Sequence, residues 1–255
     1  MLEGISVIIP VYNEIKDNLC RAIYSVFAQS YKGPVEIIVV DDGSNADFNT
    51  EFLDHGFLKQ PFDKMILKRI RKDKNEGTAS AFNVGINNSV MPFISWLSSD
   101  DQWHPNKLEI QMRSWKESHW DWCFTGWEEI ERRTMGVYAE PYFKNVVGLG
   151  SDINKFMKLQ YRPDKFMPGF INACTCIWKR SLHDTVGLFD TKLSRVQDID
   201  MWIRFAYAGF KPHLIPLSTM TRQKTNFNQK KLIERNEDIH RIQNKIYKYM
   251  MGEWE

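Results

Sequence analysis

Pairs of acidic residues close two short apolar runs of this sequence. Asp41 and Asp42 follow one run, and Asp100 and Asp101 follow another, behind two serines. Adjacent carboxylates repel each other, so the end of a buried strand is a costly place for them unless a cation lies there. Magnesium and manganese prefer one or two carboxylates together with water and phosphate oxygens. The second pair therefore predicts a divalent cation that neutralises a diphosphate and makes it a better leaving group.

The second pair also has a simpler, structural interpretation. Asp101 precedes "QWHP", and a helix is expected from Pro105 onward, so its carboxylate could cap that helix. The two interpretations are compatible if Asp100 binds the cation and Asp101 supports it or caps the helix. His104 flanks the pair, but the six histidines show no metal-ligand spacing.

A third acidic element lies in "QDIDMWIR", where Asp198 and Asp200 fall in the first turn of an expected helix over 197–209. The helix dipole favours carboxylates there, so capping explains both residues. A partly buried carboxylate at a pocket could instead act as a general base. No GxSxG motif or other recognisable nucleophile is present.

Composition narrows the class of protein. The 255 residues carry 34 Lys and Arg against 32 Asp and Glu, which argues against a nucleic-acid binder. Four irregularly spaced cysteines predict reduced thiols rather than disulfides. The N-terminal segment has the pattern of a buried strand and not of a signal peptide, and no run is long enough to span a membrane. These features predict a cytoplasmic protein, with membrane contact only at a cytoplasmic face.

The first 110 residues alternate between strand and helix patterns. The expected strands are 5–12, 35–44, 64–72 and 91–98, with a helix over 76–88 between the last two. This order is typical of an α/β fold with a parallel sheet, in which ligands bind beyond the carboxyl ends of the strands. The acidic pairs would then meet at one edge of the sheet.

The rest of the chain is less regular. Residues 120–170 are rich in aromatic residues, including Trp127, Tyr142 and Phe143, which favour core packing but could also line a substrate site. The tail from Lys230 has a helical apolar pattern with a basic opposite face. Docking on the domain is the preferred interpretation of this helix, and contact with a membrane surface or a partner is the alternative.

Six segments occur in a recognisable order: "SVIIPVYNE", "IIVVDDGS", "NEGTASAFNVGI", "SSDDQWHPNKLE", "VGLFD" and "QDIDMWIRFAYAGF". Together they resemble the consecutive motifs of family 2 glycosyltransferases, which are inverting enzymes of the GT-A type. The resemblance implies a Rossmann-like, mostly parallel central sheet flanked by helices, with a C-terminal helical extension. We expect a glycosyltransferase domain over 1–220, divided into a nucleotide-binding half (1–110) and an acceptor-binding half (111–220), and the extension over 221–255.

The resemblance also implies roles for individual residues. It places nucleotide contacts at Pro10, Tyr12, Glu14, Asp41, Asp42, Asn75, Gly77 and Ser99. It implies that Asp100 binds manganese or magnesium, supported by Asp101, and that Asp198 is the base that deprotonates the acceptor hydroxyl. Three positions differ from the usual family pattern: Ser98 replaces an acid, Phe82 an arginine and Gln197 a glutamate.

The function implied is transfer of a sugar, with inversion, from a UDP- or dTDP-linked donor to a glycan or other hydroxyl acceptor, in surface polysaccharide or glycan synthesis. The three departures motivate an alternative, a catalytically silent GT-A module that binds nucleotide or glycan. A sugar nucleotidyltransferase is a weaker alternative. It would need a glycine-rich, basic phosphate loop near the N-terminus, and "PVYNEIKDN" is not one.

Overall fold

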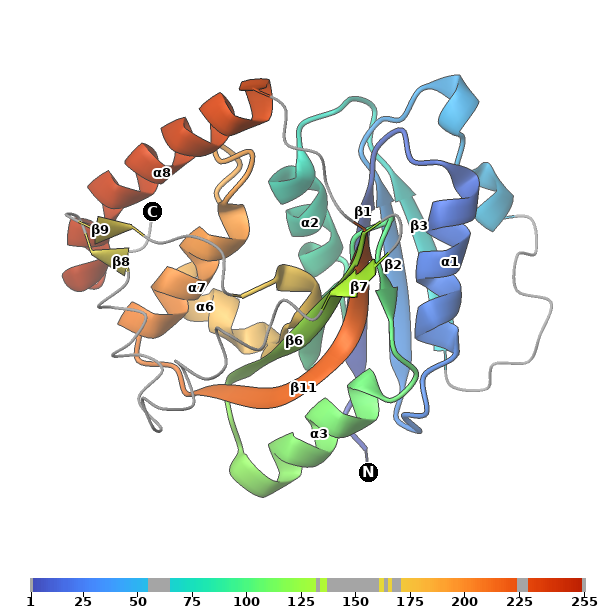
Figure 1. Ribbon diagram of the computed structural model, residues 1–255, viewed down its shortest axis with the longest axis horizontal. Coiled ribbons are helices and arrows are strands. Elements are labelled where there is room, and N and C mark those ends of the chain that lie inside the picture. Colours follow the sequence, from blue (N-terminus) through green and yellow to red (C-terminus); the bar gives the residue numbers. More distant parts are fainter. Residues whose placement is uncertain are drawn as a thin grey trace.

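A curled central sheet flanked by helices organises the molecule (Figure 1). The structure is a computed structural model that describes residues 2–54, 65–131, 134–136, 161–162, 165–166, 171–223 and 229–253. The strand order of the main sheet is β3-β2-β1-β4-β10-β6-β11-β5, and β7 pairs with β6. This mixed α/β architecture confirms the predicted fold class.

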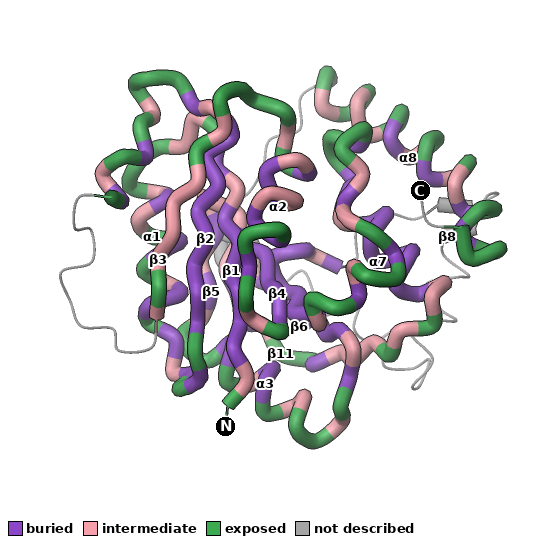
Figure 2. Tube along the Cα trace, turned by 180° about the vertical axis from the view of Figure 1, so that it is seen from behind, coloured by how far each residue is buried: buried purple, intermediate pink, exposed green. Residues whose placement is uncertain are grey.

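The first half of the sheet is parallel. Its strands are β1 (Ile5–Val11), β2 (Val35–Asp41), β3 (Met65–Arg71) and β4 (Phe93–Trp96). Every residue of β2 is buried, because α1 (Lys16–Phe27) and α2 (Thr78–Asn87) lie on opposite sides of these strands (Figures 1 and 2). Burial on both faces explains why β1 and β2 are almost continuously apolar in sequence.

The second half of the sheet has mixed pairing. It contains β5 (Gln102–Trp103), β6 (Trp122–Glu131), β7 (Thr134–Gly136), β10 (Ile177–Lys179) and β11 (Pro212–Gln223). Strand β10 runs antiparallel to both β4 and β6, whereas β11 runs parallel to β6. Two register shifts interrupt the β11–β6 pair, and such irregularities increase local twist and bend a strand.

Aromatic side chains fill the core between this half-sheet and α7 (Gln197–Tyr207). Trp122 stacks on Trp202 at 5.4 Å between ring centroids. Phe82, at the position where the resemblance expects an arginine, is fully buried and stacks on Trp96 at 4.4 Å. This departure from the family pattern is therefore part of core packing.

Short elements connect these strands and helices. They are the 3₁₀ turns Ala46–Phe48, Glu51–Leu53, Ala173–Thr175 and Arg180–Leu182, the helix α6 (His183–Val186), and the small hairpin of β8 (Tyr161–Arg162) and β9 (Lys165–Phe166). The four cysteines are free and three are buried, as predicted.

The prediction that Asp101 caps the next helix is wrong. That helix, α3 (Lys107–Ser118), begins after the N-cap residue Asn106, and β5 lies between it and Asp101. The intervening strand pairs with β11, so the chain after Asp101 first completes the sheet edge and only then turns into the helix.

The C-terminal helix α8 (Gln229–Met250) docks on α7, as preferred from the sequence (Figure 1). Ile242, Ile246 and Tyr249 are buried in this contact, whereas Leu232, expected on the same face, is 47% exposed. The Tyr249 hydroxyl donates a hydrogen bond to the buried Asp200 carboxylate at 2.5 Å. None of the described helices is long and apolar enough to cross a bilayer.

Candidate active site

A cavity of about 360 Å³ brings together residues from both halves of the molecule. Its polar and aromatic lining includes Trp96, Ser98, Asp100, Asp101, Trp127, Asn172, Cys174, Arg195, Gln197, Asp198, Arg222 and Arg235. These residues come from the loop after β4, from β6 and β11, from the segment around 172–174, and from the starts of α7 and α8. The two acids expected to do chemistry, Asp100 and Asp198, line the same cavity.

Asp100 lies in the turn after β4 and is partly buried. Burial raises the pKa of its carboxyl group, and the charge of Glu14 raises it further, while Arg222 and Lys231 act in the opposite direction. Among the described residues, no lysine or arginine forms an ion pair with Asp100. A carboxylate in this state gains stability when a cation binds it.

The acids around Asp100 do not form a closed metal cage. The described part of the chain contains no group of three or more His, Cys, Asp or Glu side chains positioned to hold a metal ion. A single well-placed carboxylate nevertheless fits magnesium or manganese, since these ions take their remaining ligands from water and substrate phosphates. The donor set therefore suits a cation that arrives with a diphosphate.

Asp101 and Ser98 shape the turn that holds Asp100. Asp101 is 5% exposed, and its backbone N–H donates to the Ser98 carbonyl at 3.2 Å. The Ser98 backbone N–H donates to the Cys174 Sγ at 3.3 Å. Burial raises the pKa of the Cys174 thiol well above its ordinary value, and the nearby Asp101 charge adds to this effect. Cys174 is thus a protonated wall residue rather than a nucleophile.

Asp198 occupies the first turn of α7 and is partly buried. Burial raises its pKa to about 6, against the opposing effects of the Ile199 and Asp198 backbone N–H groups and of the Arg222 charge. A carboxylate whose pKa lies close to neutral accepts a proton more readily than an ordinary aspartate and is still ionised at pH 7. These are the properties required of a general base.

Gln197, directly before Asp198, is 8% exposed and also lines the cavity. Its side-chain Oε1 is buried without a hydrogen-bond partner among the described residues. Because the amide is neutral, it adds no negative charge beside Asp198, and the raised pKa of Asp198 comes from burial.

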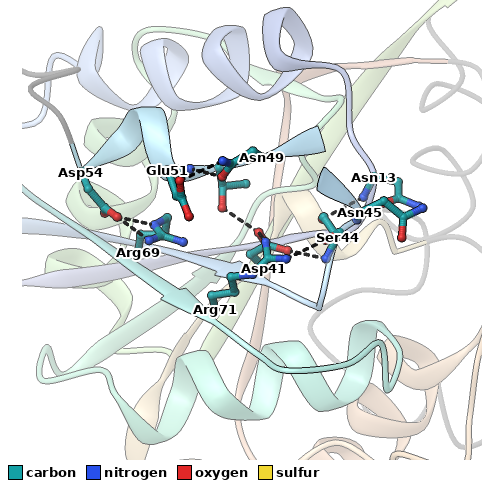
Figure 3. Close-up of polar contacts among 10 residues, drawn as sticks. Asn13, Asp41, Ser44, Asn45, Asn49, Glu51, Asp54, Arg69 and Arg71 are labelled. Atoms are coloured by element: carbon teal, nitrogen blue, oxygen red, sulfur yellow. Dashed lines mark hydrogen bonds and ion pairs between the residues drawn. The ribbon is translucent and has the colours of Figure 1, made fainter. Parts of the chain in front are cut away.

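Asp41, in contrast, stabilises the turn after β2 (Figure 3). Its buried carboxylate accepts hydrogen bonds from the Ser44 backbone N–H at 2.8 Å and the Thr50 hydroxyl at 2.6 Å. It also pairs with the Arg71 guanidinium at 2.6 Å. Burial alone would raise its pKa, but these hydrogen bonds and the Arg71 charge outweigh burial and lower it. The carboxylate is fully engaged within the protein.

Asp42, directly after β2, contacts the segment that leads from β3 to α2, which is also part of the expected nucleotide site. It forms an ion pair with Lys72 at 2.5 Å and accepts a hydrogen bond from the Gly77 backbone N–H at 2.8 Å. The Asn75 Oδ1 accepts from the same N–H at 3.1 Å. Gly77 has a φ of +93°, which favours glycine, at the start of α2. Asp42, Asn75 and Gly77 are therefore held together by direct contacts.

The remaining expected nucleotide contacts lie around the end of β1. Glu14 accepts a hydrogen bond from the Ser99 hydroxyl at 3.1 Å, which links this end to the turn of Asp100. Tyr12 is 48% exposed, and Pro10 is partly buried on β1. The exposed ring of Tyr12 is available to a ligand.

Several cavity residues were not identified from the sequence. They are Asn172, Cys174, Arg195, Arg222 and Arg235. Single arginines in irregular or amphipathic segments give no pattern that marks them as part of a site.

The aromatic residues and the histidine singled out in the sequence differ in their positions. Trp127 does line the cavity, although it is only 8% exposed. Tyr142 and Phe143 lie outside the described residues. His104 contacts the Thr221 hydroxyl at 3.1 Å rather than the acidic pair.

Comparison with known proteins decides the family. The sequence model described as "Glycosyl transferase family 2" matches residues 6–185, which is well over half of the chain. The chain belongs to glycosyltransferase family 2. This family 2 chain is 34% identical over 203 residues to a Rickettsia prowazekii protein named "Uncharacterized glycosyltransferase RP339", covering 79% of this chain and 58% of that protein.

A second relative has a more specific name. The chain is 27% identical over 209 residues to the "Amylovoran biosynthesis glycosyltransferase AmsB" of Erwinia amylovora, covering 81% of this chain and 65% of AmsB. The chain thus spans about three fifths of the length of these two curated relatives.

Solved structures show the same fold. The crystal structure of Staphylococcus aureus TarS in complex with UDP-GlcNAc superimposes with a TM-score of 0.67 at 17% identity, covering 96% of this chain and 66% of that one. A further crystal structure of TarS, residues 1–349, gives a TM-score of 0.65 at 16% identity and covers 97% of this chain and 70% of that one. These likenesses confirm the GT-A type of fold for this family 2 chain.

Proposed function

We propose that this family 2 chain is an inverting glycosyltransferase that moves a sugar from a UDP- or dTDP-linked donor to a hydroxyl group of a glycan. The single observation that carries the proposal is the pairing of Asp100 and Asp198 on one cavity. One carboxylate suits a cation-bound diphosphate and the other suits proton transfer. In-line displacement with inversion requires both functions around the same sugar.

Asp198 is the proposed base. Its pKa of about 6 leaves it ionised at neutral pH and able to take the proton of an acceptor hydroxyl as that oxygen attacks the anomeric carbon. The base must lie on the acceptor side of the sugar. The donor sugar already carries a diphosphate leaving group, so the reaction needs no enzyme nucleophile.

Asp100 is the proposed ligand of manganese or magnesium, with Asp101 and Ser98 holding its turn in shape. A bound divalent cation would neutralise the charge that develops on the departing diphosphate. The raised pKa of Asp100 and its lack of an ion-pair partner among the described residues support this role.

The nucleoside belongs at the ends of β1 and β2 in this proposal. Tyr12 is exposed there, and Pro10, Glu14, Asn75, Gly77 and Ser99 surround the same turns. Asp42 would contact the nucleobase, and Asp41 would support it by fixing the turn from Asp41 to Ser44. The UDP-GlcNAc named in the TarS complex supports a UDP-linked donor for this fold.

The acceptor is proposed to be a glycan of a surface polysaccharide. Amylovoran biosynthesis, named for the relative AmsB, supports this class. We propose that the domain is divided as the sequence predicts: residues 1–110 bind the nucleotide, residues 111–220 bind the acceptor, and residues 221–255 form the extension. We also propose a location at the cytoplasmic face of a membrane, which the exposed basic side chains Lys230 and Lys248 of α8 would favour.

A donor panel tests this proposal. The purified chain is incubated with UDP- and dTDP-linked sugars, with and without manganese, and release of the nucleoside diphosphate is followed. We expect slow, manganese-stimulated hydrolysis of at least one donor, which the variant Asp198→Asn reduces. Tight nucleotide binding without turnover of any donor would instead support the silent GT-A module. Absence of nucleotide binding would contradict both.

A further inference from the structure

Three arginines line the cavity, and all three lie beyond the residues that match the family model. Arg195 precedes α7, Arg222 lies on β11 and Arg235 lies on α8. Guanidinium groups bind carboxylates and phosphates through paired N–H donors, so an arginine-lined wall favours an anionic ligand.

The three arginines differ in how far the protein already uses them. Arg195 forms an ion pair with Glu234 of α8 at 2.8 Å. Arg222 lies close enough to Asp100 and Asp198 for its charge to affect both. No acid among the described residues forms an ion pair with Arg235, which is partly buried at the cavity. Of the three cavity arginines, Arg235 is the one without an ion-pair partner and without a named electrostatic effect on Asp100 or Asp198 among the described residues.

Gln197 lies on the same wall, next to Asp198, and keeps its amide oxygen buried. More than nine-tenths of this residue is buried, and its Oε1 has no partner in the described part of the chain. A buried acceptor without a hydrogen bond is costly and rare in folded proteins. The oxygen is itself closed off from solvent, so in this structure it faces the protein rather than the cavity.

The C-terminal helix is fixed firmly enough to place Arg235 for binding. The Asp238 carboxylate, 1% exposed, accepts hydrogen bonds from the Ser194 and Arg195 backbone N–H groups at 2.8 and 2.7 Å. The Tyr249 hydroxyl binds Asp200 further along the helix. These contacts tie α8 to the segment that carries Gln197 and Asp198, so Arg235 is held in place before any ligand arrives.

We propose that this wall binds an acceptor with a negatively charged group, a carboxylate or a phosphate, near the hydroxyl that reacts. Arg235 binds the charged group, on the same cavity wall that carries Asp198. The anion belongs to the acceptor because the wall also carries Asp198, which must face the acceptor, whereas the donor diphosphate belongs with Asp100. This inference rests on the proposed function.

The test measures binding to protein whose diphosphate site is already filled. The chain is first saturated with UDP or dTDP and manganese, and then titrated calorimetrically with methyl glucoside, methyl glucuronide or methyl glucoside 6-phosphate. These probes differ only at carbon 6, which is neutral, a carboxylate or a phosphate ester. Inorganic phosphate serves as a fourth probe. The comparison uses wild type, Arg235→Gln and Lys230→Gln, the last removing an exposed charge from the same helix outside the cavity.

We expect at least one anionic probe to bind about tenfold or more tightly than methyl glucoside, and Arg235→Gln to abolish that preference, while Lys230→Gln keeps it. The probe that binds best distinguishes a carboxylate from a phosphate. Equal binding of neutral and anionic probes, or an unchanged preference in Arg235→Gln, would overturn the inference. A tenfold loss of nucleotide affinity in Arg235→Gln would also overturn it, by assigning the arginine to the donor. Failure of the wild type to bind either nucleotide would overturn the proposed function itself.

Discussion

Asp41 after β2 and Asp198 at the start of α7 lie in two regions whose surroundings shift the pKa of a carboxyl group in opposite directions. In the turn after β2, Asp41 is fully buried and receives hydrogen bonds from Thr50 and Ser44 and the charge of Arg71, so its pKa is lowered. At the start of α7, the described groups that oppose burial of Asp198 are two backbone N–H groups and the Arg222 charge, and burial outweighs them and raises its pKa to about 6. The first arrangement favours the ionised carboxylate, and the second disfavours it, which suits the proton acceptor that we propose.

The same contrast extends to neighbouring groups. Asp42 is paired with Lys72, whereas the amide oxygen of Gln197 and the carboxylate of Asp100 have no such internal partner among the described residues. The two acids after β2 are therefore paired within the protein, whereas Asp100 at the cavity has no ion-pair partner in the described part of the chain. Groups that a fold leaves unsatisfied are those available to a substrate.

The largest expected effect is a loss of activity when Asp198, rather than Asp41, is replaced. Asp198→Asn should reduce sugar transfer by about a thousandfold, because removing a positioned general base has a cost of that order. Nucleotide affinity, measured by calorimetry, should stay unchanged. Asp184→Asn, which replaces an exposed acid outside the cavity, is the control and should keep full activity. Transfer by Asp198→Asn at the wild-type rate would refute the assignment of the base.

The next largest effect is a loss of folding stability when Asp41 is replaced. Asp41→Ala should lower the free energy of unfolding by about 2 kcal/mol, since the variant loses hydrogen bonds and an ion pair made by a buried carboxylate. Chemical denaturation with urea measures the difference.

The pH dependence of that difference has a definite sign. Because folding lowers the pKa of Asp41, its stabilising effect is fully present above its unfolded pKa of about 4 and is lost as the pH falls through the lower folded value. Wild type and Asp41→Ala should therefore differ most above about pH 5 and converge in acid. A difference that grows in acid would contradict the ion-pair account.

A smaller effect concerns the cation. Asp100→Ala should weaken manganese-dependent binding of UDP or dTDP by about tenfold, because one charged ligand is lost. Binding without manganese should change little. Asp17→Ala, which removes an exposed acid on α1, provides the control. An unchanged response to manganese in Asp100→Ala would exclude Asp100 as a cation ligand.

The smallest effect is a gain in folding stability when Asp198 is replaced, which is opposite in sign to the loss expected at Asp41. At pH 8, Asp198→Asn should raise the free energy of unfolding by about 1 kcal/mol, because folding raises the pKa of Asp198 and its ionised form is therefore unfavourable in the folded state. The gain should disappear as the pH falls below about 4, where the carboxyl group is protonated in both states. Urea denaturation at the two pH values measures it, and a loss of stability at pH 8 would contradict the raised pKa.

Part of this picture could be predicted from the sequence. The runs that form β1 and β2 are continuous and rich in β-branched residues, so a buried parallel strand is their simplest interpretation. The acids at 198 and 200 lie in the first turn of a helix, as their sequence pattern predicts. A strand is expected at the start of "INACTCIWKRSLHDTVGLFD", but its antiparallel direction, which makes the second half of the sheet mixed, depends on pairing that no local pattern reveals.

Other features depend on contacts between distant residues. Sequence alone does not reveal that Phe82 packs on Trp96. It also does not reveal that β5 separates Asp101 from the next helix, because a strand of two residues is too short to show the alternation of buried and exposed side chains. Arg235 lies in an amphipathic helix in which several residues are basic, and only the docking of α8 brings this one to the cavity.

The central claim is that Asp198 acts as the base, and the pH profile of the catalytic rate tests it most directly. The rate is measured from pH 5 to pH 8 at saturating donor and manganese. Because Asp198 must be ionised to accept a proton, the account predicts a constant rate above pH 7 and a fall of about tenfold per pH unit below an apparent pKa near 6. A constant rate down to pH 5, or the same fall in the residual activity of Asp198→Asn, would contradict the claim.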